Sequence, residues 1–478
     1  MNRAVGLKAA ACIQFAAKYV TLAVQILITA VLARLLAPEE FGAVAIVSVF
    51  TTFFSIMSDV GIGTAVIQFD TLRQDDYQAL FAFSCLLGVA LMGAFIAIAH
   101  PLSLFYRDSA VESLCVATSP AVFFSTINMV PNGLMLKRKE FASIGSRLIV
   151  VTIFSGMLAI AAAFFGLGSY SLVIQSVSSA MLIFIWNYIK MPDKGFNIHF
   201  LSALRKVFSY SLYQFGFSLI NYFNRSLDNL LIGKYLGPSA LGYYDKAYKL
   251  TTYPLSSVSG VISSVIQPYM SEHQDDPSVM YRYFLKIERF ISLTAVPIVG
   301  VLFCCGSEII TVVYGDGWAP SILPFQLLSL SLYVQFLGNP TGAFFQSLCK
   351  TNLLFTQGLI NTIITIIGLL VGLSTGSLVG VALGVSIAFC LQAIPMVILT
   401  IKCAFHANTR DLIVLMPEVL IGVVAVLLTM ASGQLLASAA PLIRLVAKMA
   451  ICLSAILLCY KAFGLLETIK ECLQRGVE

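Results

Sequence analysis

Leu231–Leu250, LIGKYLGPSALGYYDKAYKL, places several ionisable side chains inside an apolar stretch. Only 11% of the chain is charged, yet six ionisable residues gather within a short interval: Arg225, Asp228, Lys234, Asp245, Lys246 and Lys249. An ionisable side chain costs roughly 3 kcal/mol at the centre of a lipid-facing helix. We therefore expect these side chains to face a wet cavity or one another.

A related segment occurs 200 positions earlier in the chain. Ala33–Gly42, ARLLAPEEFG, aligns with Gly233–Gly242, GKYLGPSALG, and the two segments share a leucine, a proline and a final glycine in register. A repeated unit in each half of a membrane chain is typical of transporters built from two related lobes. The repeat predicts two pseudo-symmetric lobes around a central cavity.

The composition places the chain in a membrane. Hydrophobic residues make up 59% of the 478 residues, and no long polar segment could fold as a separate soluble domain. This balance predicts an all-α polytopic membrane protein. The 11 cysteines are scattered, without C-x-x-C spacing or a nearby histidine cluster. We therefore predict no metal site, no cofactor, no nucleic-acid partner and, since no nucleophile–base pair stands out, no enzyme.

Apolar runs long enough for helices of ~20 residues predict about fourteen transmembrane spans. The predicted spans lie near 9–35, 41–67, 78–99, 111–136, 146–166, 168–190, 206–236, 242–270, 284–305, 320–348, 353–373, 377–401, 414–435 and 441–464. The predicted domains are an N-terminal lobe with six spans, a C-terminal lobe with six, and a final part with two spans and a cytoplasmic tail: 1–200, 201–402 and 403–478.

The lysines and arginines orient these spans. If the N-terminus is cytoplasmic, the inner loops, such as 137–146 and 190–206, hold most of the 29 Lys and Arg residues, and the short outer loops hold few. An excess of positive charge marks cytoplasmic loops. A miscounted span would reverse this bias in every later loop, but the bias persists to the end. We therefore predict that both termini are cytoplasmic.

The intramembrane charges concentrate in the first two predicted spans of each lobe. Lys18 lies in the first span, and Asp59 lies near the cytoplasmic end of the second. In the seventh span, Asn221, Arg225 and Asp228 are spaced so that they share one helix face. These spans are therefore predicted to line the cavity between the lobes.

The predicted substrate-binding residues combine four cations with an amide, a carboxylate and an aromatic ring: Lys18, Asn221, Arg225, Asp228, Lys246, Tyr248 and Lys249. Surplus cations in a membrane cavity suit an anionic substrate such as a phosphate or diphosphate. The alternative is that the charges neutralise one another and only hold two helices in register.

Two carboxylates are candidates for ion coupling, Asp59 and Asp245. Asp245 and Lys249 are four residues apart, so they can pair on a helix. Asp59 is either a proton or cation coupling site or a cap at the end of its helix, and the sequence leaves both interpretations open.

Three stretches carry a family resemblance: VLARLLAPEEFGAVAIV (Val31–Val47), LDNLLIGKYLGPSALGYYDKAYKLTTYPL (Leu227–Leu255) and YGDGWAPSILPFQLLSLS (Tyr314–Ser331). They resemble the polysaccharide transporter family of the multidrug/oligosaccharidyl-lipid/polysaccharide flippase superfamily. The likeness extends over nearly the whole chain. It is greatest to the Wzx-type branch of colanic acid and teichuronic acid exporters.

The resemblance implies a flippase that moves undecaprenyl-diphosphate-linked oligosaccharide across the cytoplasmic membrane of a bacterium by alternating access. It implies a role in surface polysaccharide assembly, with a polysaccharide polymerase and glycosyltransferases as further partners beside the lipid bilayer. The alternative is a cation-coupled multidrug antiporter of the same fold, which would need buried carboxylates. Cations outnumber carboxylates deep in the predicted spans, which favours the flippase.

Overall fold

The computed structural model describes most of the chain as helices joined by short turns. The described residues are 7–59, 62–69, 72–191, 195–197, 200, 222, 226–271, 277–348, 350–408, 411, 416–433 and 440–465. Within these ranges there is no β-strand, which confirms the predicted all-α class. Helices suit a membrane because each backbone polar group is satisfied within its own segment.

The number of spans is only partly visible. Eleven helices among the described residues are long and apolar enough to cross a membrane, and Met416–Ser432 forms a shorter apolar helix. Most of the predicted span at 206–236 lies outside the described residues. The count of about fourteen therefore stays a prediction.

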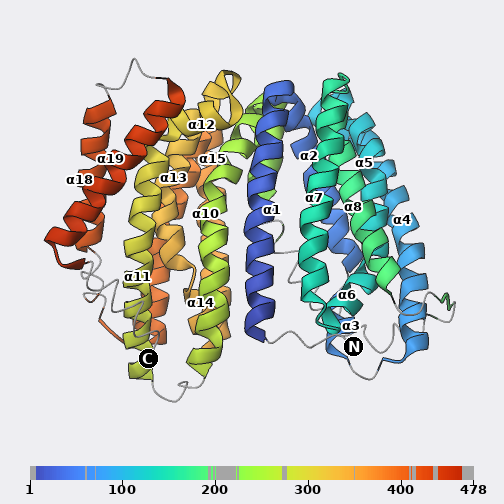
Figure 1. Ribbon diagram of the computed structural model, residues 1–478, viewed down its shortest axis with the longest axis horizontal. Coiled ribbons are helices and arrows are strands. Elements are labelled where there is room, and N and C mark those ends of the chain that lie inside the picture. Colours follow the sequence, from blue (N-terminus) through green and yellow to red (C-terminus); the bar gives the residue numbers. More distant parts are fainter. Residues whose placement is uncertain are drawn as a thin grey trace. The chain divides into compact units, whose positions relative to one another are not determined.

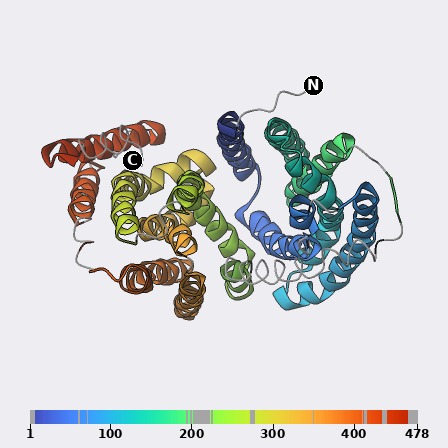
Figure 2. The same ribbon diagram turned by 90° about the horizontal axis from the view of Figure 1, so that it is seen from below.

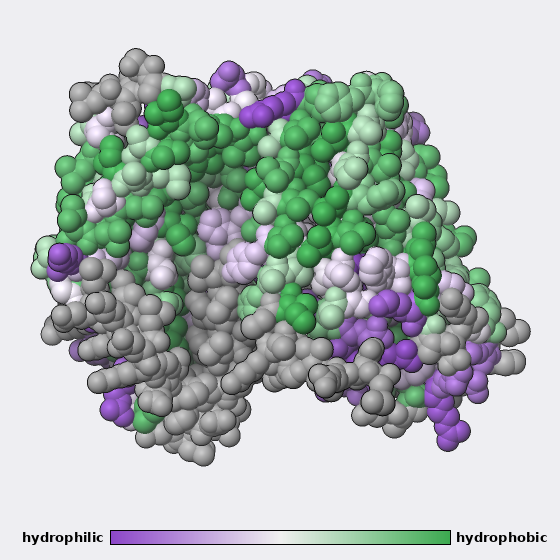
Figure 3. Space-filling view, in the orientation of Figure 1, coloured by the Kyte–Doolittle hydropathy of each residue, from purple (hydrophilic) through white to green (hydrophobic). Residues whose placement is uncertain are grey.

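The chain forms two compact units, Met1–Gly242 and Tyr243–Glu478, called here the N-terminal and C-terminal units. The lobe boundaries at 200 and 402 remain predictions. Large apolar side chains stay exposed in both units, for example Phe164 and Phe355. Hydrophobic residues cover much of the surface visible in Figure 3, as expected for a protein that faces lipid.

The described part of the N-terminal unit is a bundle of long helices with short helices between them (Figures 1 and 2). Its helices are α1 (Leu7–Leu35), α2 (Pro38–Asp59), α3 (Ile62–Gln68), α4 (Gln74–Tyr106), α5 (Ser109–Ile127), α6 (Met129–Lys137), α7 (Phe141–Phe164) and α8 (Tyr170–Lys190). Helix α7 packs between α1 and α8, and α5 contacts α2, α4 and α8. The unit therefore has α5 near its centre.

Two predicted spans of this unit are interrupted. The span predicted at 41–67 ends as α2 at Asp59, and the separate helix α3 follows it. The span predicted at 111–136 divides at Asn128 into α5 and α6. Pro131 lies in the first turn of α6, where a missing N–H group costs no helical hydrogen bond. The division places the polar side chain of Asn128 inside the unit.

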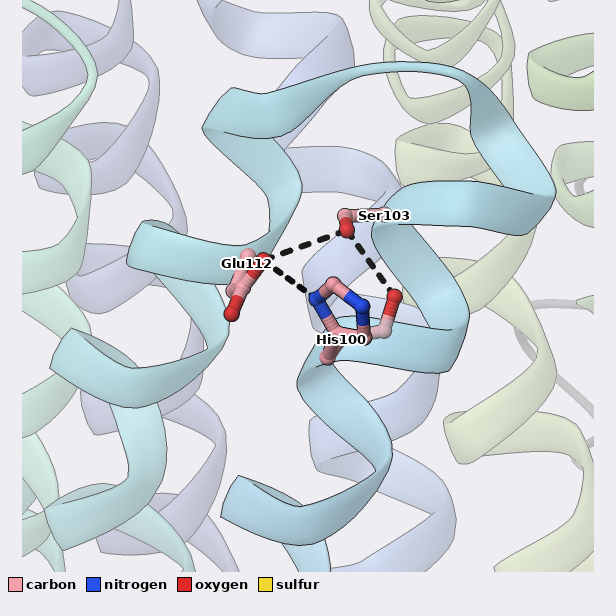
Figure 4. Close-up of polar contacts among 3 residues, drawn as sticks. All are labelled: His100, Ser103 and Glu112. Carbon is pink, nitrogen blue, oxygen red and sulfur yellow. Dashed lines mark hydrogen bonds and ion pairs between the residues drawn. The ribbon is translucent and has the colours of Figure 1, made fainter.

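A polar cluster closes the turn between α4 and α5 (Figure 4). His100 Nδ1 lies 3.1 Å from Glu112 Oε2, and the Ser103 hydroxyl donates to the same oxygen at 3.3 Å. Asp108 caps α5, because its side chain accepts from the backbone N–H of Ala110 at 2.9 Å. These contacts fix the hairpin that sets α4 against α5.

The C-terminal unit contains most of α10 (Gly237–Ser271), which begins at the end of the N-terminal unit. Its other helices are α11 (Pro277–Cys304), α12 (Gly306–Tyr314), η1 (Asp316–Ser321), α13 (Ile322–Gly338), α14 (Thr341–Ser347), α15 (Thr351–Ser374), α16 (Leu378–Leu391), α17 (Ala393–Val397), η2 (Ile398–Ala404), α18 (Met416–Gly433) and α19 (Pro441–Ala462). Helix α13 packs against α11 and α16, and α15 pairs with α16.

Two ion pairs attach the last two long helices to the rest of this unit. Lys448 Nζ of α19 lies 2.7 Å from Glu308 Oε1 of α12, and Arg289 Nε of α11 lies 3.3 Å from Glu418 Oε1 of α18. Both glutamates are buried. Removing one partner of a buried pair leaves an uncompensated charge, so these pairs fix where α18 and α19 dock.

Candidate functional site

Helix α10 presents the ionisable cluster that the sequence predicted. Asp245 and Lys246 are 4% and 8% exposed, whereas Lys249 is exposed. Asp245 Oδ2 lies 2.9 Å from Lys249 Nζ and 3.7 Å from Lys246 Nζ. The pairing of Asp245 with Lys249 is thus confirmed. Because one carboxylate serves two ammonium groups, these three residues together carry a net positive charge.

Aromatic rings accompany this cluster. Tyr248, half-buried, stacks on Tyr244 with ring centroids 5.9 Å apart. Tyr243 contacts the Trp318 ring edge-on, and its backbone carbonyl accepts from the Ser321 hydroxyl at 2.9 Å. These contacts anchor the start of the cluster to η1. The site therefore combines flat aromatic surfaces with cations.

The other predicted site residues belong to the N-terminal unit. Lys18 is exposed on α1, and Asp228 is half-buried, with its Oδ1 accepting from the following backbone N–H at 2.9 Å. Asn221 and Arg225 lie outside the described residues, as does the side chain of Asp59, whose backbone ends α2. A cavity shared by these residues and the α10 cluster stays a prediction.

The two copies of the repeated segment meet within the N-terminal unit. Gly42 of α2 packs against Pro238 in the first turn of α10, and Gly242 packs against Pro38 in the first turn of α2. A Cβ atom at either glycine would overlap the carbonyl oxygen of the opposite proline. We call this reciprocal arrangement the repeat contact. It explains why both copies carry proline and glycine at the same spacing.

Lys234 belongs to this contact region and not to the α10 cluster. Its Nζ lies 4.1 Å from the centroid of the Phe105 ring and donates to the Phe105 carbonyl. The neighbouring Tyr106 hydroxyl donates to the Leu230 carbonyl at 3.4 Å. Helical residues 226–235 are therefore held against the end of α4.

Sequence reasoning missed two buried ionisable side chains. Arg147 lies at the cytoplasmic end of the span predicted at 146–166, but its side chain is buried in the second turn of α7. Glu288 of α11 is 1% exposed, and its Oε1 has no hydrogen-bond partner among the described residues. Each residue lies in the first half of its helix, where a charged side chain is easily attributed to the adjoining loop. Their positions beyond the first helical turn were the sequence feature that could have indicated burial.

Comparisons with known proteins agree on one family and one fold. A family model described as "Polysaccharide biosynthesis protein" matches residues 31–323. The teichuronic acid biosynthesis protein TuaB of Bacillus subtilis is 24% identical over 70% of this chain and 69% of its own. The lipopolysaccharide biosynthesis protein WzxC of Escherichia coli is 22% identical over 70% of this chain and 69% of its own.

Two solved structures show a similar fold. The lipid II flippase MurJ, in an inward closed conformation, aligns with a TM-score of 0.74 at 14% identity and covers 94% of this chain and 98% of its own. An inward-facing multidrug resistance transporter of the MATE family aligns with a TM-score of 0.58 at 18% identity and covers 78% and 92%. Both support the predicted all-helical fold.

Proposed function

Because this chain belongs to the polysaccharide biosynthesis protein family, we propose that it is a flippase for surface polysaccharide assembly. It moves polyprenyl-diphosphate-linked oligosaccharide units across the bacterial cytoplasmic membrane by alternating access. The observation that carries the proposal is the family match, which spans more than half of the chain. The relatives named for teichuronic acid and lipopolysaccharide biosynthesis support the same substrate class. A polysaccharide polymerase and glycosyltransferases are its proposed partners.

The electrostatics of α10 support an anionic substrate. A bare ion that enters hydrocarbon faces a Born cost on the order of 20 kcal/mol. Fixed cations such as Lys246 and Lys249 can replace the lost hydration of a diphosphate, while the polyprenyl tail stays in lipid. We propose that Lys18 and Arg225 bind the diphosphate together with these two lysines. Tyr248 would stack on a sugar ring. Asp59 and Asp245 are the proposed carboxylates for ion coupling.

A multidrug antiporter is the second candidate, because the MATE-type transporter shares the fold. Such a pump needs carboxylates that bind a cation and release it on protonation. The α10 cluster has the opposite balance, with two ammonium groups around one carboxylate. This balance favours the flippase.

Deleting the gene should abolish the surface glycan and accumulate lipid-linked repeat units on the cytoplasmic leaflet. The reason is that the assembly step on the outer face would lose its substrate. Glycan staining and extraction of lipid-linked saccharides measure both effects, with a plasmid copy of the gene as the control. A deletion strain that keeps its glycan and becomes sensitive to cationic dyes would instead support the antiporter.

We also propose that both termini and the loop 137–146 are cytoplasmic, as the charge bias predicts. In a background without cysteines, Lys139→Cys should resist a membrane-impermeant thiol reagent in intact cells. Ser109→Cys, in the turn predicted to be outside, is the matched control and should be labelled. Both positions are exposed, so burial does not account for a difference. If Lys139→Cys is labelled and Ser109→Cys is protected, the true orientation is the reverse of the one proposed.

A further inference from the structure

A partly open cavity, lined by both polar and apolar residues, lies in the N-terminal unit between α2, α3, α5 and α6. Its volume is about 260 Å³, and its polar lining is Ser55, Ser58, Ser125, Asn128 and Asn132. None of the described residues that line it is charged. Sites for drug-sized ligands occupy ~300–1,000 Å³. This cavity therefore suits one sugar residue or a small anion and not a whole repeat unit.

A buried cation lies directly behind the two asparagines. Arg147 is 8% exposed, and its Nη1 donates to Asn132 Oδ1 at 3.1 Å and to Asn187 Oδ1 at 2.5 Å. Asn187, fully buried, in turn donates to Asn128 Oδ1 at 2.8 Å. Among the described residues, no carboxylate lies within ion-pair distance of Arg147, and its Nε has no hydrogen-bond partner.

This network determines what the asparagines present to the cavity. A guanidinium can only donate hydrogen bonds, so Asn132 must turn its carbonyl oxygen toward Arg147. Asn128 likewise turns its oxygen toward the Asn187 amide. The NH₂ groups of both asparagines are then left for the cavity that the two residues line. The cavity therefore receives two hydrogen-bond donors, polarised by a cation behind them.

The serine side chains supply the complementary groups. The Ser55 hydroxyl donates to the Thr51 carbonyl at 2.9 Å, and the Ser58 hydroxyl donates to the Ser55 carbonyl at 2.7 Å. Because each hydroxyl proton is engaged by the helix backbone, both oxygens offer only acceptor capacity to a ligand. A ligand that fits this lining carries an oxyanion together with hydroxyl groups.

We propose that this cavity is a binding site for an oxyanion of the translocated saccharide, held by the Asn128 and Asn132 amides under the charge of Arg147. The identity of the saccharide rests on the proposed function, whereas the oxyanion chemistry rests on the lining itself. A buried cation that has no carboxylate partner among the described residues favours an incoming anion, because the anion restores local neutrality. Two sources share this chemistry: the carboxylate of an acidic sugar and the phosphate of the lipid linkage.

Thermal unfolding of the purified full-length protein in detergent tests the proposal, with glucuronate, inorganic diphosphate and neutral glucose as probes. A ligand that binds the folded state raises the melting temperature as its concentration rises. We expect glucuronate or diphosphate to raise it and glucose to leave it unchanged at equal concentration and matched ionic strength. A response to glucuronate alone identifies the sugar acid. Because the α10 cluster is also proposed to bind diphosphate, a response to diphosphate alone identifies the linkage at this cavity only if Asn132→Asp weakens it.

Asn132→Asp separates ligand binding from a structural role of the network. One aspartate oxygen can still accept from Arg147, so the fold is retained, while the other replaces an NH₂ donor with a negative charge. Apparent affinity for the anion should fall on the order of tenfold or more, because a charge-assisted donor becomes a repulsive acceptor. Asn128→Asp likewise replaces an NH₂ donor with a negative charge, while one aspartate oxygen can still accept from the Asn187 amide. Arg138→Gln, which removes an exposed cation at the end of α6, is the matched control and should respond like the wild type.

Two results would overturn the proposal. One is a wild-type melting temperature that neither anion raises. The other is an anion-induced rise in melting temperature that is as large in both aspartate variants as in the wild type, which would place anion binding elsewhere in the protein. Either result leaves the flippase assignment standing if the deletion phenotype is as expected, so the two proposals fail separately.

Discussion

Gly42→Ala should sharply lower the stability of the protein, and Gly242→Ala should do so to a similar extent. In each variant the new methyl group would overlap the backbone carbonyl of Pro238 or Pro38 in the repeat contact. A backbone atom at a helix start cannot rotate away as a side chain can, so the two helices must separate. Overpacking of this kind costs ~1–3 kcal/mol or more. The measurement is the melting temperature of the detergent-purified protein, with the membrane yield beside it.

Gly93→Ala and Gly358→Ala are the matched controls. A Cβ atom at either position would meet nothing within 4 Å, and both glycines lie in helix interiors. Alanine is the better helix former by ~1 kcal/mol, so these variants should be neutral or slightly stabilised. If Gly42→Ala melts at the same temperature as the controls, the repeat contact is not as close as described.

Lys246→Met should reduce glycan export on the order of tenfold or more, with the protein still present in the membrane. The reason is that one charge-assisted contact to the substrate, worth ~2 kcal/mol, would be lost. Complementation of the deletion strain measures export, and immunoblotting of membranes measures the protein level. Lys402→Met, which removes an exposed lysine from η2, is the control and should keep full export.

Lys246→Met also distinguishes substrate binding from helix registration. The variant leaves Asp245 and Lys249 as a neutral pair, with Oδ2 and Nζ 2.9 Å apart. If the α10 charges only neutralise one another, export should therefore stay near the wild-type level. If Lys246 binds the substrate anion, export should fall although this pair is intact. Full export by Lys246→Met would contradict our assignment of Lys246.

The sequence was most informative where one physical effect dominates. Hydrophobic composition predicted the helical membrane fold, because only helices satisfy the backbone within lipid over such long runs. The spacing of Asp245 and Lys249 predicted their ion pair, since residues four apart share a helix face. Both inferences depend on neighbours along the chain, so no knowledge of the packing was needed.

Features that depend on packing between distant segments could not be predicted. The repeat was visible in the sequence, but the contact of Gly42 with Pro238 was not, because periodicity does not say which segments meet. Arg147 looked like a loop-flanking cation, because only the fold brings it to Asn132 and Asn187. Near Asn128, the segment 128–133 (NMVPNG) places a proline and a glycine inside the span predicted at 111–136. Such residues bend a helix, but they do not say whether it divides into two.

The repeat contact has an implication for how a chain of this kind arises. Each copy of the segment supplies a proline to the other copy's glycine, so the surface is complementary to itself. Self-complementarity of this type is the defining property of a two-fold symmetric homodimer interface. A duplicated and fused chain thereby makes, within one molecule, the contact that two copies of a half-length chain would make across a two-fold axis. Both copies keep the proline and the glycine that meet there, Pro38 with Gly42 and Pro238 with Gly242.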